Sequence, residues 1–186
     1  PAAIDAGKYQ GKLLVLPIGT EAEIMAYRKD IFEEKGLIAP TTYDELYETA
    51  KKVKTDKMAG YVSRGLRGLS VVWEWSGFLL SYGGRYFDEA GAAAFNSEKG
   101  IAASEMYGKL LRETGPEGVV NYGWPEVLAA AQQSKAAILI EASGALPALE
   151  GEESLAKGKL SYTQIPAGPD GETIPNYWFW NLAMNP

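Results

Sequence analysis

Segments with strand-like and helix-like patterns alternate along this chain of 186 residues. The clearest strand is the run AAILIE at residues 136–141, because its continuous apolar character is typical of a strand buried on both faces. The clearest helix follows Thr42, since Glu45 stands three residues later, as in a capping box, and apolar residues then recur at helical spacing. This alternation predicts an α/β fold built in layers.

The other segments fit the same alternation. Further strands are expected at 12–18, 23–30, 59–63, 159–166 and near the C-terminal end, with the first one stopped by Pro17. Further helices are expected at 71–82, 96–114, 125–133 and 143–150. Ser70 is expected to cap the helix at 71–82, and the pair Gly83-Gly84 to end it.

The last strand, within NYWFWNLAMNP, is unusually aromatic. Because side chains alternate between the two faces of a strand, Trp178 and Trp180 are expected on the same face. A strand this apolar is normally paired or buried.

Several function classes are excluded by what the chain lacks. It has no Cys and no His, so it has neither a thiolate or imidazole zinc site nor a Ser-His-Asp triad. A formal net charge of -6 argues against a nucleic-acid surface. No run of about 18 apolar residues is present to span a membrane. The chain also begins without Met or a signal peptide, so we interpret it as a piece of a larger protein.

The aromatic content favours one ligand chemistry. A sugar or polyol presents hydroxyl groups on apolar C–H faces, so its binder needs carboxylates, Arg or Asn for the hydroxyls and flat rings for those faces. Indole is a good platform because it offers a large area at little entropic cost. The chain has 5 tryptophans, and we expect four of them in loops or at the ends of elements.

Several short motifs occur in an order that resembles a known family. They are GKLLVLPIGTEAEIMAYRKDIFEEKGL near the N-terminus, SYGGRYFD, FNSEKG, WPEVLAAAQQSKAAILIE and IPAGPDG. Together, from about Gly11 to the end of the chain, they are similar to the extracellular solute-binding proteins of carbohydrate ABC transporters, the maltose-binding-like class. The resemblance is specific in aggregate, since no single motif suffices.

The resemblance implies a periplasmic-binding-protein type II fold, in which two α/β lobes are joined by crossing strands and sugar binds between them. This chain is similar to the second, three-layer lobe, with the partner lobe absent. The implied domains are 1–30 for the N-terminal segment and hinge crossing strands, 31–172 for the ligand-binding lobe and 173–186 for the returning hinge strand. The aromatic C-terminal strand is then the returning crossover.

The resemblance also implies a biological setting. The whole protein is expected to be periplasmic or extracellular, either free or lipid-anchored, with its targeting signal absent from this chain. It is expected to bind a carbohydrate or polyol and to deliver it to a membrane ABC permease, without a cofactor, metal or catalytic residue and without nucleic acid.

Four candidate ligand-binding residues match positions of the family. Glu21, at the first crossing, matches an acidic acceptor of hydroxyl groups, although a solvated surface Glu is the alternative. Arg64, before a glycine, matches polyol-binding relatives and could donate to hydroxyls or hold Glu21 or Glu141 by a bidentate bond, although a loop salt bridge is as plausible. Glu141 ends a buried strand, where ligands of α/β sheets bind, but it could instead cap the next helix. Trp73 could contact ligand or belong to the core.

Three further tryptophans complete the candidate site. One of Trp178 and Trp180 is expected to meet the ligand while the other packs the hinge, and Trp180 matches the family better. Trp124 could line the cleft or could staple its helix at Pro125. Trp75 is assigned to the core.

The sequence departs from the family at two places. Ser134 stands where a glycine usually precedes the KAA motif, and Trp178-Phe179 replaces a double glycine, which favours a small cleft and a monosaccharide, polyol or disaccharide.

Two other functions remain open. Glu21 and Glu141 could be the carboxylate pair of a glycoside hydrolase. The protein could also be a sugar sensor or adaptor that docks on a receptor.

Overall fold

The structure is a computed structural model that describes residues 2–183. They form two compact units, one of residues 23–176 and a smaller one of residues 2–22 together with 177–183. None of the helices within residues 2–183 has the length and apolar character needed to cross a membrane.

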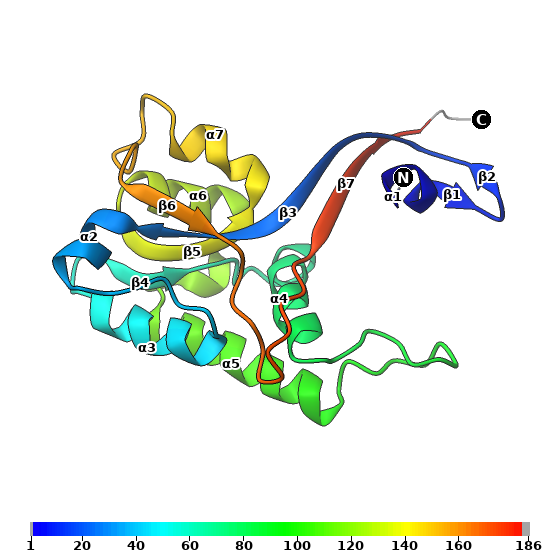
Figure 1. The fold of residues 1–186 in the computed structure, drawn as a ribbon, viewed down its shortest axis with the longest axis horizontal. Helices are drawn as coiled ribbons and strands as arrows, with labels where there is room; N and C mark the ends of the chain where they lie inside the picture. Colours follow the sequence, from blue (N-terminus) through cyan, green and yellow to red (C-terminus); the bar gives the residue numbers. More distant parts are fainter. Residues whose placement is uncertain (1, 184–186) are drawn as a thin grey trace. The chain divides into compact units, whose positions relative to one another are not determined.

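The larger unit is built on a sheet of four strands in the order β4-β5-β3-β6 (Figure 1). These strands are β3 (Leu16–Arg28, of which Glu23–Arg28 belong to this unit), β4 (Ala59–Val62), β5 (Ala136–Ala142) and β6 (Leu160–Thr163). β4 and β5 are parallel, whereas β3 pairs antiparallel with both β5 and β6. All seven residues of β5 are buried, which confirms the buried strand predicted from its apolar run.

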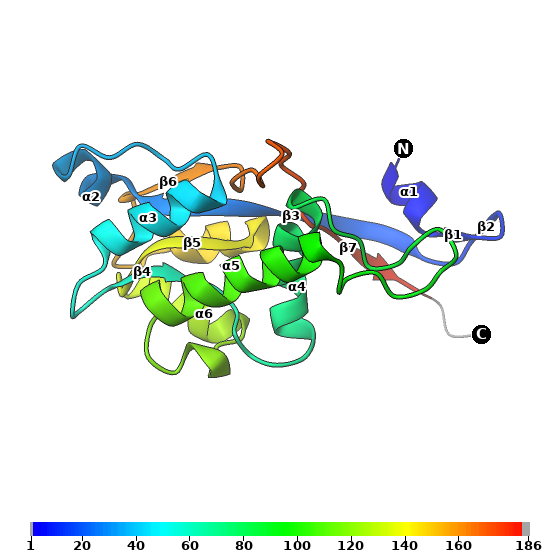
Figure 2. The same cartoon turned by 90° about the horizontal axis from the view of Figure 1, so that it is seen from below.

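Helices cover both faces of this sheet and give the unit three layers. On one face lie α3 (Tyr43–Val53), α4 (Leu69–Ser81) and α5 (Glu98–Thr114); on the other lie α6 (Trp124–Gln132) and α7 (Leu146–Leu149) (Figure 1). Figure 2 shows the first layer face on, with α3 and α5 side by side. Successive residues of β5 supply the two cores, because Ile138 and Ile140 face the first layer while Leu139 faces the second.

Most of the predicted helices are confirmed. Thr42 caps α3 through the expected capping box, since its side chain accepts the Glu45 N–H and the Glu45 carboxylate accepts the Thr42 N–H. Ser97 caps α5, and Pro125 lies in the first turn of α6. The segment at 143–150 forms a short 3-10 turn, Ser143–Ala145, followed by α7.

Some predictions are wrong. Pro17 does not end a strand: β3 runs through it and accommodates it with a register shift between Pro17 and Gly19. Ser70 does not cap α4, because that helix begins at Leu69, two residues earlier than expected, and its N-cap is Gly68. A helix that the sequence reasoning missed, α2 (Lys29–Glu34), follows β3 directly.

The tryptophans are also not distributed as expected. The prediction that four of the five lie in loops or at the ends of elements is wrong, because Trp73 and Trp75 both lie inside α4. Trp75 packs against the core between the sheet and the layer of α3, α4 and α5. Its Nε1 donates to Ser104 Oγ at 3.0 Å.

The smaller unit contains the aromatic strand. β7 (Tyr177–Leu182) pairs antiparallel with the first half of β3, which places Trp178 opposite Glu21 and Trp180 opposite Gly19. The rings of Trp178 and Trp180 lie 5.9 Å apart between centroids, as their shared strand face predicts. The unit also holds α1 (Ala2–Ala6), β1 (Lys8–Tyr9) and β2 (Lys12–Leu13). Residues 1 and 184–186 of the predicted terminal segments lie outside the described residues.

Candidate functional site

The candidate site of the larger unit lies at one edge of its sheet. Because β4 and β5 are parallel, their C-terminal ends meet at the same edge, which is where ligands of α/β sheets bind. Arg64 lies in the loop that follows β4, and Glu141 is the penultimate residue of β5. The fold therefore brings together two residues that are 77 positions apart in the sequence.

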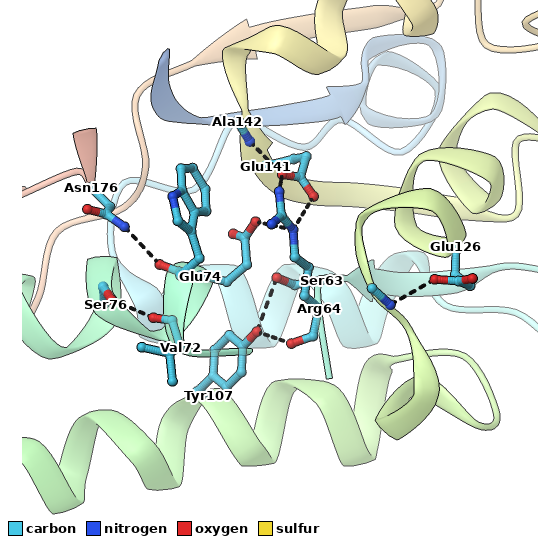
Figure 3. A network of polar contacts seen from close by, with 12 residues as sticks. Ser63, Arg64, Val72, Glu74, Ser76, Tyr107, Glu126, Glu141, Ala142 and Asn176 are labelled. Carbon is cyan, nitrogen blue, oxygen red and sulfur yellow. Dashed lines mark hydrogen bonds and ion pairs between the residues drawn. The ribbon is translucent and has the colours of Figure 1, made fainter. Parts of the chain in front are cut away.

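Arg64 and Glu141 form a bidentate ion pair (Figure 3). Arg64 Nε donates to Glu141 Oε2 at 2.9 Å, and Arg64 Nη2 donates to Glu141 Oε1. Oε1 also accepts the backbone N–H of Ala142 at 2.8 Å, and Glu141 is 1% exposed. This confirms the bidentate pairing of Arg64 with Glu141. The carboxylate of Glu141 therefore accepts hydrogen bonds from donors of the protein itself.

Two aromatic residues hold the rest of Arg64. Its guanidinium carbon lies 5.0 Å from the centre of the Trp73 ring, a distance typical of a cation–π contact. The hydroxyl of Tyr107, on α5, donates to the Arg64 carbonyl oxygen at 2.6 Å (Figure 3). Trp73 itself is only 4% exposed, so its ring supports Arg64 from within the lobe.

The ion pair leaves part of the guanidinium available. Arginine carries five N–H donors, and Glu141 takes one from Nε and one from Nη2. Among residues 2–183 no acceptor is found for the other three, and the side chain is 13% exposed. Arg64 can therefore offer several N–H groups, in a fixed direction, to the hydroxyl oxygens of a ligand.

Two more carboxyl groups, which the sequence reasoning missed, are buried beside this pair. Glu74, on α4, is 0% exposed and places Oε1 3.2 Å from Arg64 Nε. Glu23, on β3, is 2% exposed, and its Oε2 accepts the backbone N–H of Asn176 at 2.8 Å. A signal for Glu74 was present, because it is the only charged residue in the helical segment at 69–82.

Burial controls the charge of these two carboxyl groups. It raises the pKa of Glu23 from 4.5 to about 8; the hydrogen bond from Asn176 opposes this rise, while the negative charge of Glu141 adds to it. Burial also raises the pKa of Glu74 well above its ordinary value, with the charges of Glu141 and Glu23 acting in the same direction. Glu23 is therefore mostly protonated at pH 7, and burial favours the neutral form of Glu74 in the same way.

The charge of Arg64 is secured in the same way. Burial alone would lower the pKa of Arg64, but the hydrogen bond to Glu141, together with the negative charge of that carboxylate, raises it. Within residues 2–183 no group of three or more acidic side chains is arranged to hold a metal ion.

Apolar side chains are exposed at the same edge of the sheet. The loop that carries Arg64 is bound to the segment just before α6, because the Leu66 N–H donates to the Tyr122 carbonyl oxygen at 2.9 Å. Trp124 is the first residue of α6 and is 41% exposed. Leu66 and Leu69 are exposed as well. This edge therefore offers both fixed donors and apolar surface.

The other candidate residues belong to the smaller unit. Glu21 is partly buried and lies on β3 opposite Trp178, while Trp180 is 52% exposed. The predicted residues thus fall into two groups, one of Arg64, Trp73, Glu141 and Trp124 and another of Glu21, Trp178 and Trp180.

The larger unit defines the class of protein, a three-layer α/β lobe of the periplasmic-binding-protein type II fold. The sequence pattern of the bacterial extracellular solute-binding proteins matches residues 1–184, and the chain belongs to this family. A probable ABC transporter-binding protein of Deinococcus radiodurans is 28% identical over the whole chain, which covers 46% of that protein. The chain thus spans about half the length of this relative.

Two solved structures show the same fold. The maltose-bound MalE3 of T. maritima is 30% identical with a TM-score of 0.92, and the alignment covers 100% of this chain and 48% of that protein. A solute-binding protein of Agrobacterium vitis S4 with bound D-mannitol is also 30% identical, with a TM-score of 0.89 and coverage of 97% and 45%.

Proposed function

We propose that this chain forms one wall of a binding site for an uncharged sugar or polyol, and that the whole protein delivers this solute to a membrane ABC permease. The wall is the edge that carries Arg64 and Trp124. Glu21, Trp178 and Trp180 of the smaller unit are proposed as further ligand contacts.

The observation that carries this proposal is the fixed guanidinium of Arg64. Glu141 and the Trp73 ring hold it, and its remaining N–H groups have no acceptor among residues 2–183. Hydroxyl oxygens suit such donors, and the exposed Trp124 ring suits apolar C–H faces. Because Arg64 is already neutralised by Glu141, the site favours a solute without charge.

The comparisons support the same ligand class. One similar structure holds maltose and another holds D-mannitol, a disaccharide and a polyol. Because family members are extracellular solute-binding proteins, we place the whole protein outside the cytoplasmic membrane, where a permease could receive its solute.

The arrangement does not favour a glycoside hydrolase. Such an enzyme needs one carboxylate free to act as nucleophile or base. Both oxygens of Glu141 accept hydrogen bonds from Arg64 or from the Ala142 backbone, so this carboxylate is not free. We therefore propose a binding protein and not an enzyme.

The test begins with a thermal-shift screen of sugars and polyols against the full-length protein, followed by a titration of the best solute monitored by tryptophan fluorescence. Replacing Arg64 with Lys should weaken binding about 10- to 100-fold, because lysine cannot keep the bidentate pair and also donate to the solute. Arg67→Lys, in the same loop and exposed, is the matched control.

Equal affinities of the wild type and Arg64→Lys would refute the role of Arg64. Stabilisation by amino acids or anions, with no response to any carbohydrate, would refute the proposed solute class.

A further inference from the structure

The buried carboxyl of Glu74 has no role in the site described so far. It lies on α4, next to Trp73, and it is completely buried. Its Oε1 lies 3.2 Å from Arg64 Nε, yet the single N–H of that nitrogen points to Glu141 Oε2 at 2.9 Å (Figure 3). Glu74 is therefore next to the guanidinium without receiving its hydrogen bond.

The groups around Glu74 account for the hydrogen bonding of Arg64 to Glu141 and not to Glu74. Arg64 is the positive group that acts on Glu74, whereas Glu141 and Glu23 are both acidic. If Glu74 were ionised as well, two carboxylates would compete for one N–H, and the guanidinium would have two orientations of similar energy. A neutral Glu74 leaves Glu141 as the single strong acceptor.

We propose that Glu74, in its protonated form, is a positioning residue that fixes the orientation of the Arg64 guanidinium for solute binding. Glu74 does not touch the solute, because none of it reaches the surface. It acts through Arg64, by filling the space beside Nε with a polar group that carries no charge. This inference rests on the proposed function for its effect on affinity, but not for its effect on Arg64 itself.

Two substitutions of similar size separate this role from simple packing. Glu74→Gln keeps a neutral polar group beside Arg64 Nε, so solute affinity should stay within about twofold of the wild type. Glu74→Leu keeps the volume but removes the polar atoms, so affinity should fall about tenfold while the melting temperature is kept or raised. Glu105→Gln, an exposed substitution on α5, is the matched control.

A second readout does not need a solute. The side-chain Nε–H of Arg64 should give one NMR signal that exchanges slowly with solvent in the wild type and in Glu74→Gln. In Glu74→Leu that signal should broaden or exchange faster.

Each outcome is decisive. Wild-type affinity and an unchanged Arg64 signal in Glu74→Leu would overturn the proposal, because Glu74 would then only fill space. A loss of affinity in Glu74→Gln as large as in Glu74→Leu would overturn it too, because the ionised carboxylate would be needed. If the wild type and Glu105→Gln bind no sugar or polyol, the proposed function fails, and the Arg64 signal alone decides the role of Glu74.

Discussion

Replacing Glu23 with glutamine should change how the stability of the protein depends on pH. Glu23 is 2% exposed, and burial raises the pKa of its carboxyl from 4.5 to about 8. Between these two pH values the folded protein keeps a proton that the unfolded chain has released. The unfolded state therefore binds fewer protons, so the free energy of unfolding falls as pH rises through this window.

The size of the effect follows from the same two values. Each pH unit inside the window lowers the free energy of unfolding by about 1.4 kcal/mol. From pH 4.5 to pH 7 the loss assigned to Glu23 is about 3 kcal/mol. Glutamine resembles the protonated carboxyl and can still accept the Asn176 N–H at the same place, but it does not titrate.

The assay is urea unfolding of the full-length wild type and of Glu23→Gln at several pH values from 4.5 to 8. Because all other titrating groups are shared, the difference between the two proteins reports the titration of Glu23 together with its effect on Glu74. The variant should gain about 3 kcal/mol on the wild type between pH 4.5 and pH 7. Glu117→Gln, which replaces an exposed acid, should show no such gain. Parallel pH profiles of wild type and Glu23→Gln would refute the argument that burial keeps Glu23 neutral.

Two further predictions concern single residues of the larger unit. Replacing Thr42 with Ala removes the side chain that accepts the Glu45 N–H and should cost about 1 kcal/mol of unfolding free energy in a urea titration; an unchanged midpoint would contradict the cap. Ser134 has a φ of 55°, in the left-handed region that favours glycine, so Ser134→Gly should stabilise the protein by about 1 kcal/mol. Ser134→Ala is the control for the lost hydroxyl, and a Ser134→Gly variant less stable than wild type would contradict the reasoning.

Local patterns in the sequence predicted much of this fold. The capping box at Thr42 and the apolar run of β5 are short-range signals, and both elements form where they were expected. Gly100 is a weak helix former inside α5, yet glycine suits this position, because a Cβ there would stand 1.9 Å from the Phe95 carbonyl oxygen. The need for glycine thus comes from a contact between α5 and the loop before it, and the pattern of residues within the helix does not reveal this contact.

The candidate site was predicted less completely, for a similar reason. The pairing of Arg64 with Glu141 was one of two open alternatives, and only the parallel pairing of β4 with β5 decides it. Glu23 was missed because nothing in the sequence around it indicates burial, and Glu74 was missed although it is the only charged residue of the helical segment at 69–82. The roles of Glu21, Trp124, Trp178 and Trp180 stay predictions.

The position of the Glu23 carboxyl depends on Gly77, a neighbouring residue of α4 that has no side chain. A Cβ on Gly77 of α4 would stand 2.2 Å from Glu23 Oε2, so any larger residue at 77 would displace that carboxyl. Displacing it would move an acid that raises the pKa of Glu74 and would break the bond to the Asn176 N–H. The protonation of this buried cluster thus depends partly on an uncharged position, because a larger residue at 77 requires the Glu23 carboxyl to move.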